Sequence, residues 1–168
     1  NNILNVAKFD RHHLQTHLYE DTVAAIYATI ADDMMLRAST QHRLINVSIP
    51  KDLPTVAADR GSIGEALGNL IDNAIKYSGD EVRIQISVRS EDNCVLVSVR
   101  DNGFGIPADK LVFLFDKYSR LHTDATKING FGIGLNYVKN IVEKHRGEVR
   151  VASEPGQGSE FCVLLPVA

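Results

Sequence analysis

The ten residues 68–77, GNLIDNAIKY, decide how this chain folds. They lie in a longer pattern whose apolar side chains recur every three or four residues and form one stripe: Ile63, Ala66, Leu67, Leu70, Ile71 and Ala74. Polar side chains form a stripe on another face: Glu65, Asn69, Asp72, Asn73 and Lys76. Asp59 is a suitable N-cap, so we predict a helix from there to about Tyr77 that packs one side on a core.

The polar stripe of this helix has two interpretations. Taken alone, such a stripe is most often a solvated surface. Asn69 and Asn73, however, are poor helix formers placed four residues apart. Keeping both in mid-helix costs some stability, which favours a functional role for this face.

A glycine-rich turn, DNGFGIP at residues 101–107, directly follows a predicted strand. Gly103 and Gly105 permit a close approach of the main chain to a ligand, and Asp101 can accept a hydrogen bond from an exocyclic amine. An ordinary Asp-Asn-Gly turn is an equally good interpretation of this stretch alone. The match to a G-x-G-x-x-A dinucleotide fingerprint is weak, because no βαβ unit surrounds it.

Two further glycine clusters follow. Residues 130–135, GFGIGL, open a predicted helix, where exposed main-chain N–H groups and the helix dipole suit a phosphate; a flexible loop is the alternative. Residues 156–161, GQGSEF, precede the last predicted strand and taken alone indicate a hairpin turn. The P-loop pattern G-x-x-x-x-G-K-[ST] is absent from the sequence.

The remaining elements place these motifs in one fold. Strands are predicted at residues 46–49, 55–57, 82–88, 95–99, 149–152 and 161–165, and a second long helix from about 132 to 145. Residues 1 to about 42 have a helical pattern with a joint near 10–13, and residues 119–129 form a polar loop. Pro107 suits the first position of a helix. Segregated helices and hairpins predict a two-layer α/β sandwich.

Composition and charge narrow the class of protein. The chain has 168 residues, which suits one domain with a short appendage, and a net charge of −3, which gives no basic field for nucleic acid or an anionic membrane. No apolar run reaches the length of a membrane span, so we expect no membrane insertion by these residues. Cys94 and Cys162 lie in apolar runs and are interpreted as buried, reduced thiols of a cytosolic domain.

The order of the motifs resembles a known family. Asn-x-x-x-Asn-Ala-x-Lys-Tyr, Asp-x-Gly-x-Gly-Ile, Phe-Asp-x-Tyr, Gly-x-Gly-x-Gly-Leu and Gly-x-Gly-Ser-x-Phe are similar to the N, G1, F, G2 and G3 boxes of sensor histidine kinases, over about residues 42–168. The resemblance implies a Bergerat-type α/β sandwich, a mixed, mostly antiparallel sheet with helices on one face. Gyrase, mismatch-repair and chaperone ATPases share that fold.

The resemblance also implies roles, carried over position by position. Asn73 would hold Mg2+, Asn69 would orient that site and Lys76 would contact phosphate, which makes these three the catalytic residues. Tyr77 would lie against the ATP, Asp101 would read the adenine amino group and Ser159 would support the adenine side. The other implied nucleotide contacts are Gly103, Gly105, Ile106, Lys127, Gly130, Phe131, Gly132, Ile133, Gly134 and Leu135. Phe115 would hold the start of an ATP lid at residues 119–129, with Arg120 a further phosphate candidate.

One position separates the enzyme classes in this family. Hydrolytic relatives carry a water-activating Glu where this chain has Asn69, and an amide cannot take a proton. The resemblance therefore favours transfer of the γ-phosphate to a histidine, which needs no base when one ring nitrogen is unprotonated. Departures at Tyr118, Phe131 and Arg146 affect the lid more than binding.

The implied setting is a two-component system. No histidine here has the family's phosphoacceptor context, so the acceptor is expected on the protein's own dimerisation domain, with a response regulator as the next partner. Residues 1–18 resemble the tail of the dimerisation helix, and residues 19–168 the ATP-binding domain of a membrane-anchored sensor, on the cytoplasmic side. The alternatives are an ATP-hydrolysing relative, or a nucleotide-binding interaction module such as an anti-sigma-type kinase or an inactive sensor.

Overall fold

The structure is a computed structural model and describes residues 19–21, 43–116 and 134–168. Its elements in chain order are β1 (Tyr19–Asp21), β2 (Arg43–Ser48), β3 (Val56–Ala58), α3 (Arg60–Lys76), β4 (Val82–Glu91), β5 (Cys94–Asp101), α4 (Ala108–Leu111), α5 (Gly134–Lys144), β6 (Glu148–Glu154) and β7 (Gly158–Pro166). The predicted helix over residues 1–42 and the predicted loop at 119–129 lie outside the described residues.

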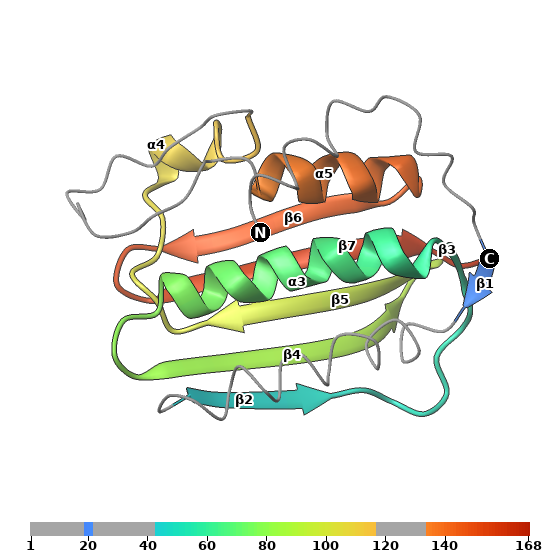
Figure 1. The fold of residues 1–168 in the computed structure, drawn as a ribbon, viewed down its shortest axis with the longest axis horizontal. Helices are drawn as coiled ribbons and strands as arrows, with labels where there is room; N and C mark the ends of the chain where they lie inside the picture. Colours follow the sequence, from blue (N-terminus) through green and yellow to red (C-terminus); the bar gives the residue numbers. More distant parts are fainter. Residues whose placement is uncertain (1–18, 22–42, 117–133) are drawn as a thin grey trace.

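A five-stranded sheet with the order β2-β4-β5-β7-β6 forms one layer. Only β2 and β4 pair in parallel, with Arg43 opposite Val82, and the other three neighbours are antiparallel. The two long helices, α3 and α5, lie side by side on one face of this sheet (Figure 1). The prediction of a mixed, mostly antiparallel sheet with helices on one face is therefore confirmed.

The core lies between the helices and the sheet. Every residue of the predicted apolar stripe of α3 is buried, and β4 alternates buried and exposed residues along most of its length, with Ile84 and Ile86 turned to the helices. Asp59 caps α3, because its carboxylate accepts hydrogen bonds from the amides of Gly61 at 2.9 Å and Ser62 at 3.2 Å. The predicted helix and its cap are thus confirmed.

A buried histidine joins the two helices at the end of the layer where α3 begins and α5 ends. His145, 2% exposed, follows α5, and its Nδ1–H donates to the carbonyl of Ile141 at 2.7 Å. Its Nε2 accepts the main-chain N–H of Asp59 at 3.0 Å. The ring therefore links the end of α5 to the cap of α3, a structural role that the sequence did not indicate.

A smaller sheet lies at the edge of the domain. β1 pairs with β3 in antiparallel register, Tyr19 opposite Ala58, and Val56 of β3 also bridges to Val167. The amide of Ala168 donates to the carbonyl of Thr55 at 2.9 Å. β3 is consequently held from two sides just before α3 begins.

Several sequence predictions need correction. Cys94 and Cys162 are free but only half-buried, since each lies on the face of the sheet that α3 and α5 do not cover. Pro107 is the N-cap of α4 rather than its first helical residue, because its ψ of 145° is extended. Cross-strand pairing also makes β4, β5, β6 and β7 longer than their apolar cores predicted.

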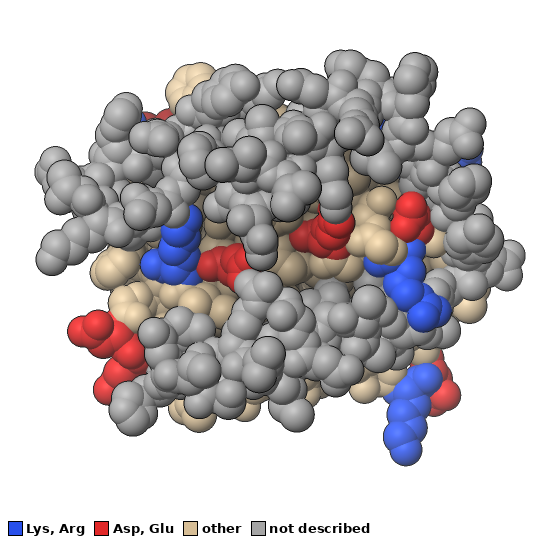
Figure 2. All heavy atoms as spheres, in the orientation of Figure 1, with Lys and Arg blue, Asp and Glu red and all other residues tan. Residues whose placement is uncertain are grey.

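On the face shown in Figure 2, the charges of the described residues have no dominant sign. Acidic and basic side chains of the described residues lie interspersed on the face shown in Figure 2. Within the described ranges, no helix is both long and apolar enough to cross a bilayer.

Candidate functional site

The components of the predicted site gather at one edge of the sandwich. The carboxyl ends of α3, β5 and β6 and the first residue of α5 lie on the same side of the molecule, next to α4 (Figure 1). This edge joins motifs that are separated by as many as 90 positions in the sequence.

Asn69, the first asparagine on the polar face of α3, lies next to the start of α5. The Asn69 Nδ2 donates to the carbonyl of Glu65 at 2.8 Å, one turn earlier. Its Oδ1 would lie 3.4 Å from a Cβ atom built on Gly134, the first residue of α5. Asn69 and the N-terminus of α5, with its partial positive charge, are therefore neighbours.

Asn73, Lys76 and Tyr77 continue this face to the end of α3. The Asn73 side chain is half-buried, one turn beyond Asn69, and its carbonyl accepts the amide of Tyr77 at 3.0 Å. The Lys76 ammonium is 5.9 Å from the centre of the Tyr77 ring, whose side chain is 40% exposed. Burial raises the pKa of Tyr77, so its hydroxyl stays protonated and can act as a donor at neutral pH.

Asp101 ends β5 as a buried carboxylate with one oxygen occupied. It is 7% exposed, and its Oδ1 accepts main-chain hydrogen bonds from Gly103 at 2.7 Å and Ser159 at 3.2 Å. Within the described part of the chain, no hydrogen bond reaches its Oδ2. Burial raises the pKa of this carboxyl, and the two amide hydrogen bonds oppose that rise.

The loop after Asp101 runs in close contact with main chain on two sides. A Cβ atom on Gly103 would lie 2.3 Å from the carbonyl oxygen of Tyr77. Gly105 has a φ of +67°, and its Cβ would lie 1.9 Å from the carbonyl oxygen of Glu154. Both glycines are required by packing against α3 and the β6–β7 turn, in addition to any ligand.

Hydrogen bonds hold this loop between the same two elements. The amide of Phe104 donates to the carbonyl of Tyr77 at 3.0 Å, and the amide of Gly156 donates to the carbonyl of Phe104 at 2.7 Å. Loop residues 103–105 therefore connect the end of α3 to the turn before β7.

Ser153 is a central residue that sequence reasoning missed. Its hydroxyl accepts the amide of Ile106 at 2.8 Å and lies 2.9 Å from both the carbonyl of Gly158 and the hydroxyl of Ser159. Ser159, predicted on the adenine side, is 8% exposed and shares its hydroxyl with this network. A signal existed, since Ser153 is a polar residue on the helix-facing positions of β6.

The other predicted contacts divide into two groups. Leu135 and Phe115 are partly buried against the core, and the Asn136 side chain donates to the carbonyl of Phe115 at 2.8 Å, which ties the start of α5 to the end of the α4 segment. Seven residues singled out from the sequence lie outside the described residues: Tyr118, Arg120, Lys127, Gly130, Phe131, Gly132 and Ile133.

The donor set at this edge suits magnesium only in combination with phosphate. Within residues 19–21, 43–116 and 134–168, no group of three or more His, Cys, Asp or Glu side chains could hold a metal ion. Mg2+ commonly takes one or two protein oxygens and completes its shell with water and substrate phosphates. The Asn73 carboxamide oxygen fits that arrangement.

Residues 58–168 match the family model described as "Histidine kinase-, DNA gyrase B-, and HSP90-like ATPase". The chain belongs to this ATPase family. That match covers α3, the Asp101 loop, α5 and the last two strands, which are the elements that build the site.

The relatives of this chain include a sensor protein and a sensory kinase. The chain is 32% identical to the sensor protein RprX of Bacteroides fragilis over 98% of this chain and 32% of that protein. It is 43% identical to the adaptive-response sensory kinase SasA of Synechococcus elongatus over 77% of this chain and 33% of that protein. The chain thus spans about a third of the length of these relatives.

Solved structures of the family agree with the fold. Full-length ShkA in complex with AMPPNP matches with a TM-score of 0.83 at 27% identity, over 100% of this chain and 35% of that one. The catalytic domain of histidine kinase ThkA matches with a TM-score of 0.76 at 23% identity, over 89% of this chain and 95% of that one, which shows the fold alone.

Proposed function

We propose that this chain binds Mg–ATP at the edge described above and transfers the γ-phosphate to a histidine of a dimerisation domain in its own sensor kinase. The observation that carries the proposal is Asp101, a buried carboxylate with one oxygen held by two amides and the other without a hydrogen bond in the described structure. Such an oxygen needs a donor, and the adenine amino group is a donor of the right kind.

The remaining groups fit the rest of the nucleotide. Tyr77 and the loop at Gly103–Ile106 would take the base, with Ser159 supporting Asp101 through its amide. Asn73 would hold Mg2+, Asn69 would orient that site, and Lys76 and the start of α5 at Gly134 would face the phosphates. Magnesium supplies charge neutralisation for the transferring phosphoryl group.

Phosphotransfer is favoured over hydrolysis by the side chains that precede Asn73. Asn69 cannot serve as a base, and its amide is turned toward Glu65. The Glu65 carboxylate, one turn further back, accepts the Tyr137 hydroxyl at 2.5 Å, and burial together with that carboxylate raises the pKa of Tyr137. We therefore assign no water-activating base to this site and expect the acceptor to be a histidine.

The sensor-kinase relatives support a setting with further partners. We propose that residues 1–18 continue a dimerisation helix, that residues 19–168 form the ATP-binding domain, and that the phosphoryl group passes from the histidine to a response regulator. Membrane anchoring of the complete sensor is part of the same proposal.

Calorimetric titration with a non-hydrolysable ATP analogue, with and without Mg2+, tests the binding step. We expect magnesium-dependent binding in the micromolar range, about −8 kcal/mol, that Asn73→Ala loses because the proposed metal ligand is gone. Asn46→Ala, on the exposed face of β2, is the matched control and should bind normally. Equal affinity of Asn73→Ala and the wild-type chain would refute the metal assignment.

A phosphate-transfer assay distinguishes a histidine kinase from an interaction module and from an ATPase. With a dimerisation domain from a sensor kinase added, labelled phosphate should appear on that domain's histidine. ATP binding without any transfer would favour an interaction module, and steady release of phosphate by this chain alone would favour an ATPase.

A further inference from the structure

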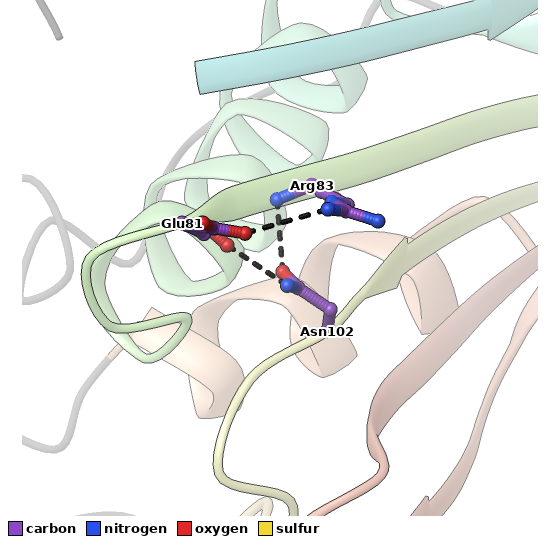
Figure 3. Close-up of polar contacts among 3 residues, drawn as sticks. All are labelled: Glu81, Arg83 and Asn102. Carbon is purple, nitrogen blue, oxygen red and sulfur yellow. Dashed lines mark hydrogen bonds and ion pairs between the residues drawn. The ribbon is translucent and has the colours of Figure 1, made fainter. Parts of the chain in front are cut away.

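Asn102, between Asp101 and Gly103, has a side chain whose two polar atoms are both used. Its Oδ1 accepts the main-chain N–H of Arg83 at 2.8 Å, and its Nδ2 donates to the main-chain carbonyl of Glu81 at 2.8 Å. Figure 3 shows the carboxamide of Asn102 directed at these two groups, where the chain enters β4. One side chain therefore connects the loop after β5 to the segment that follows α3.

The Asn102 contact lies where the β4–β5 ladder ends. The β4–β5 ladder ends with Ile84 opposite Asp101, although β4 itself begins two residues earlier at Val82. The next position of β5 would be Asn102 opposite Arg83. Its side chain takes over the acceptor and donor functions that main-chain groups have along the rest of the ladder.

The main chain after Asn102 therefore forms no further ladder hydrogen bonds with β4. Instead of continuing the ladder, the amide of Gly103 turns to the Asp101 Oδ1, and the amide of Phe104 turns to the carbonyl of Tyr77. The amide of Gly103, one of the two amides that hold the Asp101 carboxylate, thus depends on how the chain leaves residue 102.

We propose that Asn102 is a positioning residue for base recognition: it fixes the end of β5 so that the free oxygen of Asp101 faces the adenine amino group. This inference rests on the proposed nucleotide site. Asn suits the position because it offers one acceptor and one donor at the required length. Aspartate would place an oxygen against the Glu81 carbonyl, and alanine would leave both main-chain groups without this partner.

The test compares ATP with ITP, which carries a carbonyl oxygen in place of the adenine amino group. Dissociation constants for both, measured by calorimetry with Mg2+, give a selectivity ratio. We expect the wild-type chain to prefer ATP by at least about tenfold, the lower range for a hydrogen bond to a charged group. Asn102→Ala should bring the ratio to within about threefold of one, because the Asp101 oxygen loses its fixed direction.

Matched controls come from the same contact. The side chains of Glu81 and Arg83 form an exposed ion pair at 3.4 Å, but Asn102 uses only their main-chain atoms. Glu81→Ala and Arg83→Ala should therefore keep the wild-type ratio. Asn102→Asp retains the acceptor for the Arg83 amide, so it tests the same idea if Asn102→Ala does not fold, and its ratio should also fall.

The outcomes separate this inference from the proposal on which it rests. A folded wild-type chain that binds neither nucleotide, or binds them equally, overturns the proposed adenine site and this inference with it. A wild-type preference for ATP that Asn102→Ala and Asn102→Asp both retain overturns the inference alone. Equal weakening of ATP and ITP, with the ratio unchanged, would show a purely structural role and would overturn it as well.

Discussion

Replacing Asp101 with asparagine separates recognition of the base from folding. The carboxamide of Asp101→Asn has the shape of the carboxyl group, and its oxygen can still accept the amides of Gly103 and Ser159. The second oxygen becomes an NH2 group, which would face the NH2 group of adenine. The substitution therefore leaves the loop intact and replaces an attractive contact with the base by a repulsive one.

The magnitude follows from the kind of hydrogen bond removed. A bond to a charged group contributes about 1.5–3 kcal/mol, so affinity for ATP should fall by about 10- to 150-fold. The free energy of unfolding of the Asp101→Asn variant should rise or stay the same. Burial raises the pKa of Asp101, so the folded state disfavours the ionised form, and this group's stabilising contribution is present at acid pH and lost as pH rises through the raised pKa.

Calorimetry and thermal denaturation of the same samples check both parts. Asp109→Asn removes one negative charge from an exposed position on α4 and should bind ATP like the wild-type chain. Wild-type affinity for ATP should decline with acidity at a higher pH than an ordinary aspartate would cause, and the Asp101→Asn variant should not show that decline. Unchanged ATP affinity, or a large loss of melting temperature, would refute the reasoning.

Four other substitutions test the scaffold by thermal denaturation. Gly105→Ala should lower the free energy of unfolding by at least about 2 kcal/mol, because it combines left-handed backbone strain with a clash. Gly156→Ala, at φ +79° in open space, should cost only the strain, about 1 kcal/mol. Equal losses for the two variants would contradict the packing account. His145→Ala should cost about 2–4 kcal/mol, since it leaves a cavity and orphans the cap amide of α3, and a loss under about 1 kcal/mol would rule out that link. Ser153→Ala should cost about 1–3 kcal/mol, because the loop amide that it accepts loses its partner, and unchanged melting would show that the hydroxyl is dispensable.

Local sequence patterns predicted the elements that depend on local rules. The apolar stripe and cap of α3 and the alternation along β4 follow from the period of a helix or a strand, and both patterns were confirmed. In β5, by contrast, residues 95–99 are all buried, so alternation was not confirmed there. The parallel pairing of β2 with β4 was not predictable in this way, because no local pattern distinguishes a parallel from an antiparallel neighbour.

In the candidate site, too, residues in local motifs were predicted and residues with distant partners were not. Asp101, Gly103 and Gly105 were found from a motif, and the structure brings them together with Tyr77 and Ser159. Ser153, Asn102 and His145 escaped notice because their partners are main-chain groups 47, 21 and 86 positions away. A main-chain partner so far along the chain has no side-chain identity, so no local sequence motif records such a contact.

The double attachment of β3 has a mechanical consequence. This strand is bonded to β1 on one side and to Val167 on the other, Ala168 is bonded to Thr55 just before it, and α3 begins two residues after it. A pull on the main chain at Asp21 is therefore transmitted through paired strands into the first turn of α3, with no slack loop between them. At 1.5 Å per residue, the 17-residue helix is a stiff rod of about 25 Å, and Asn73 and Lys76 lie at its far end.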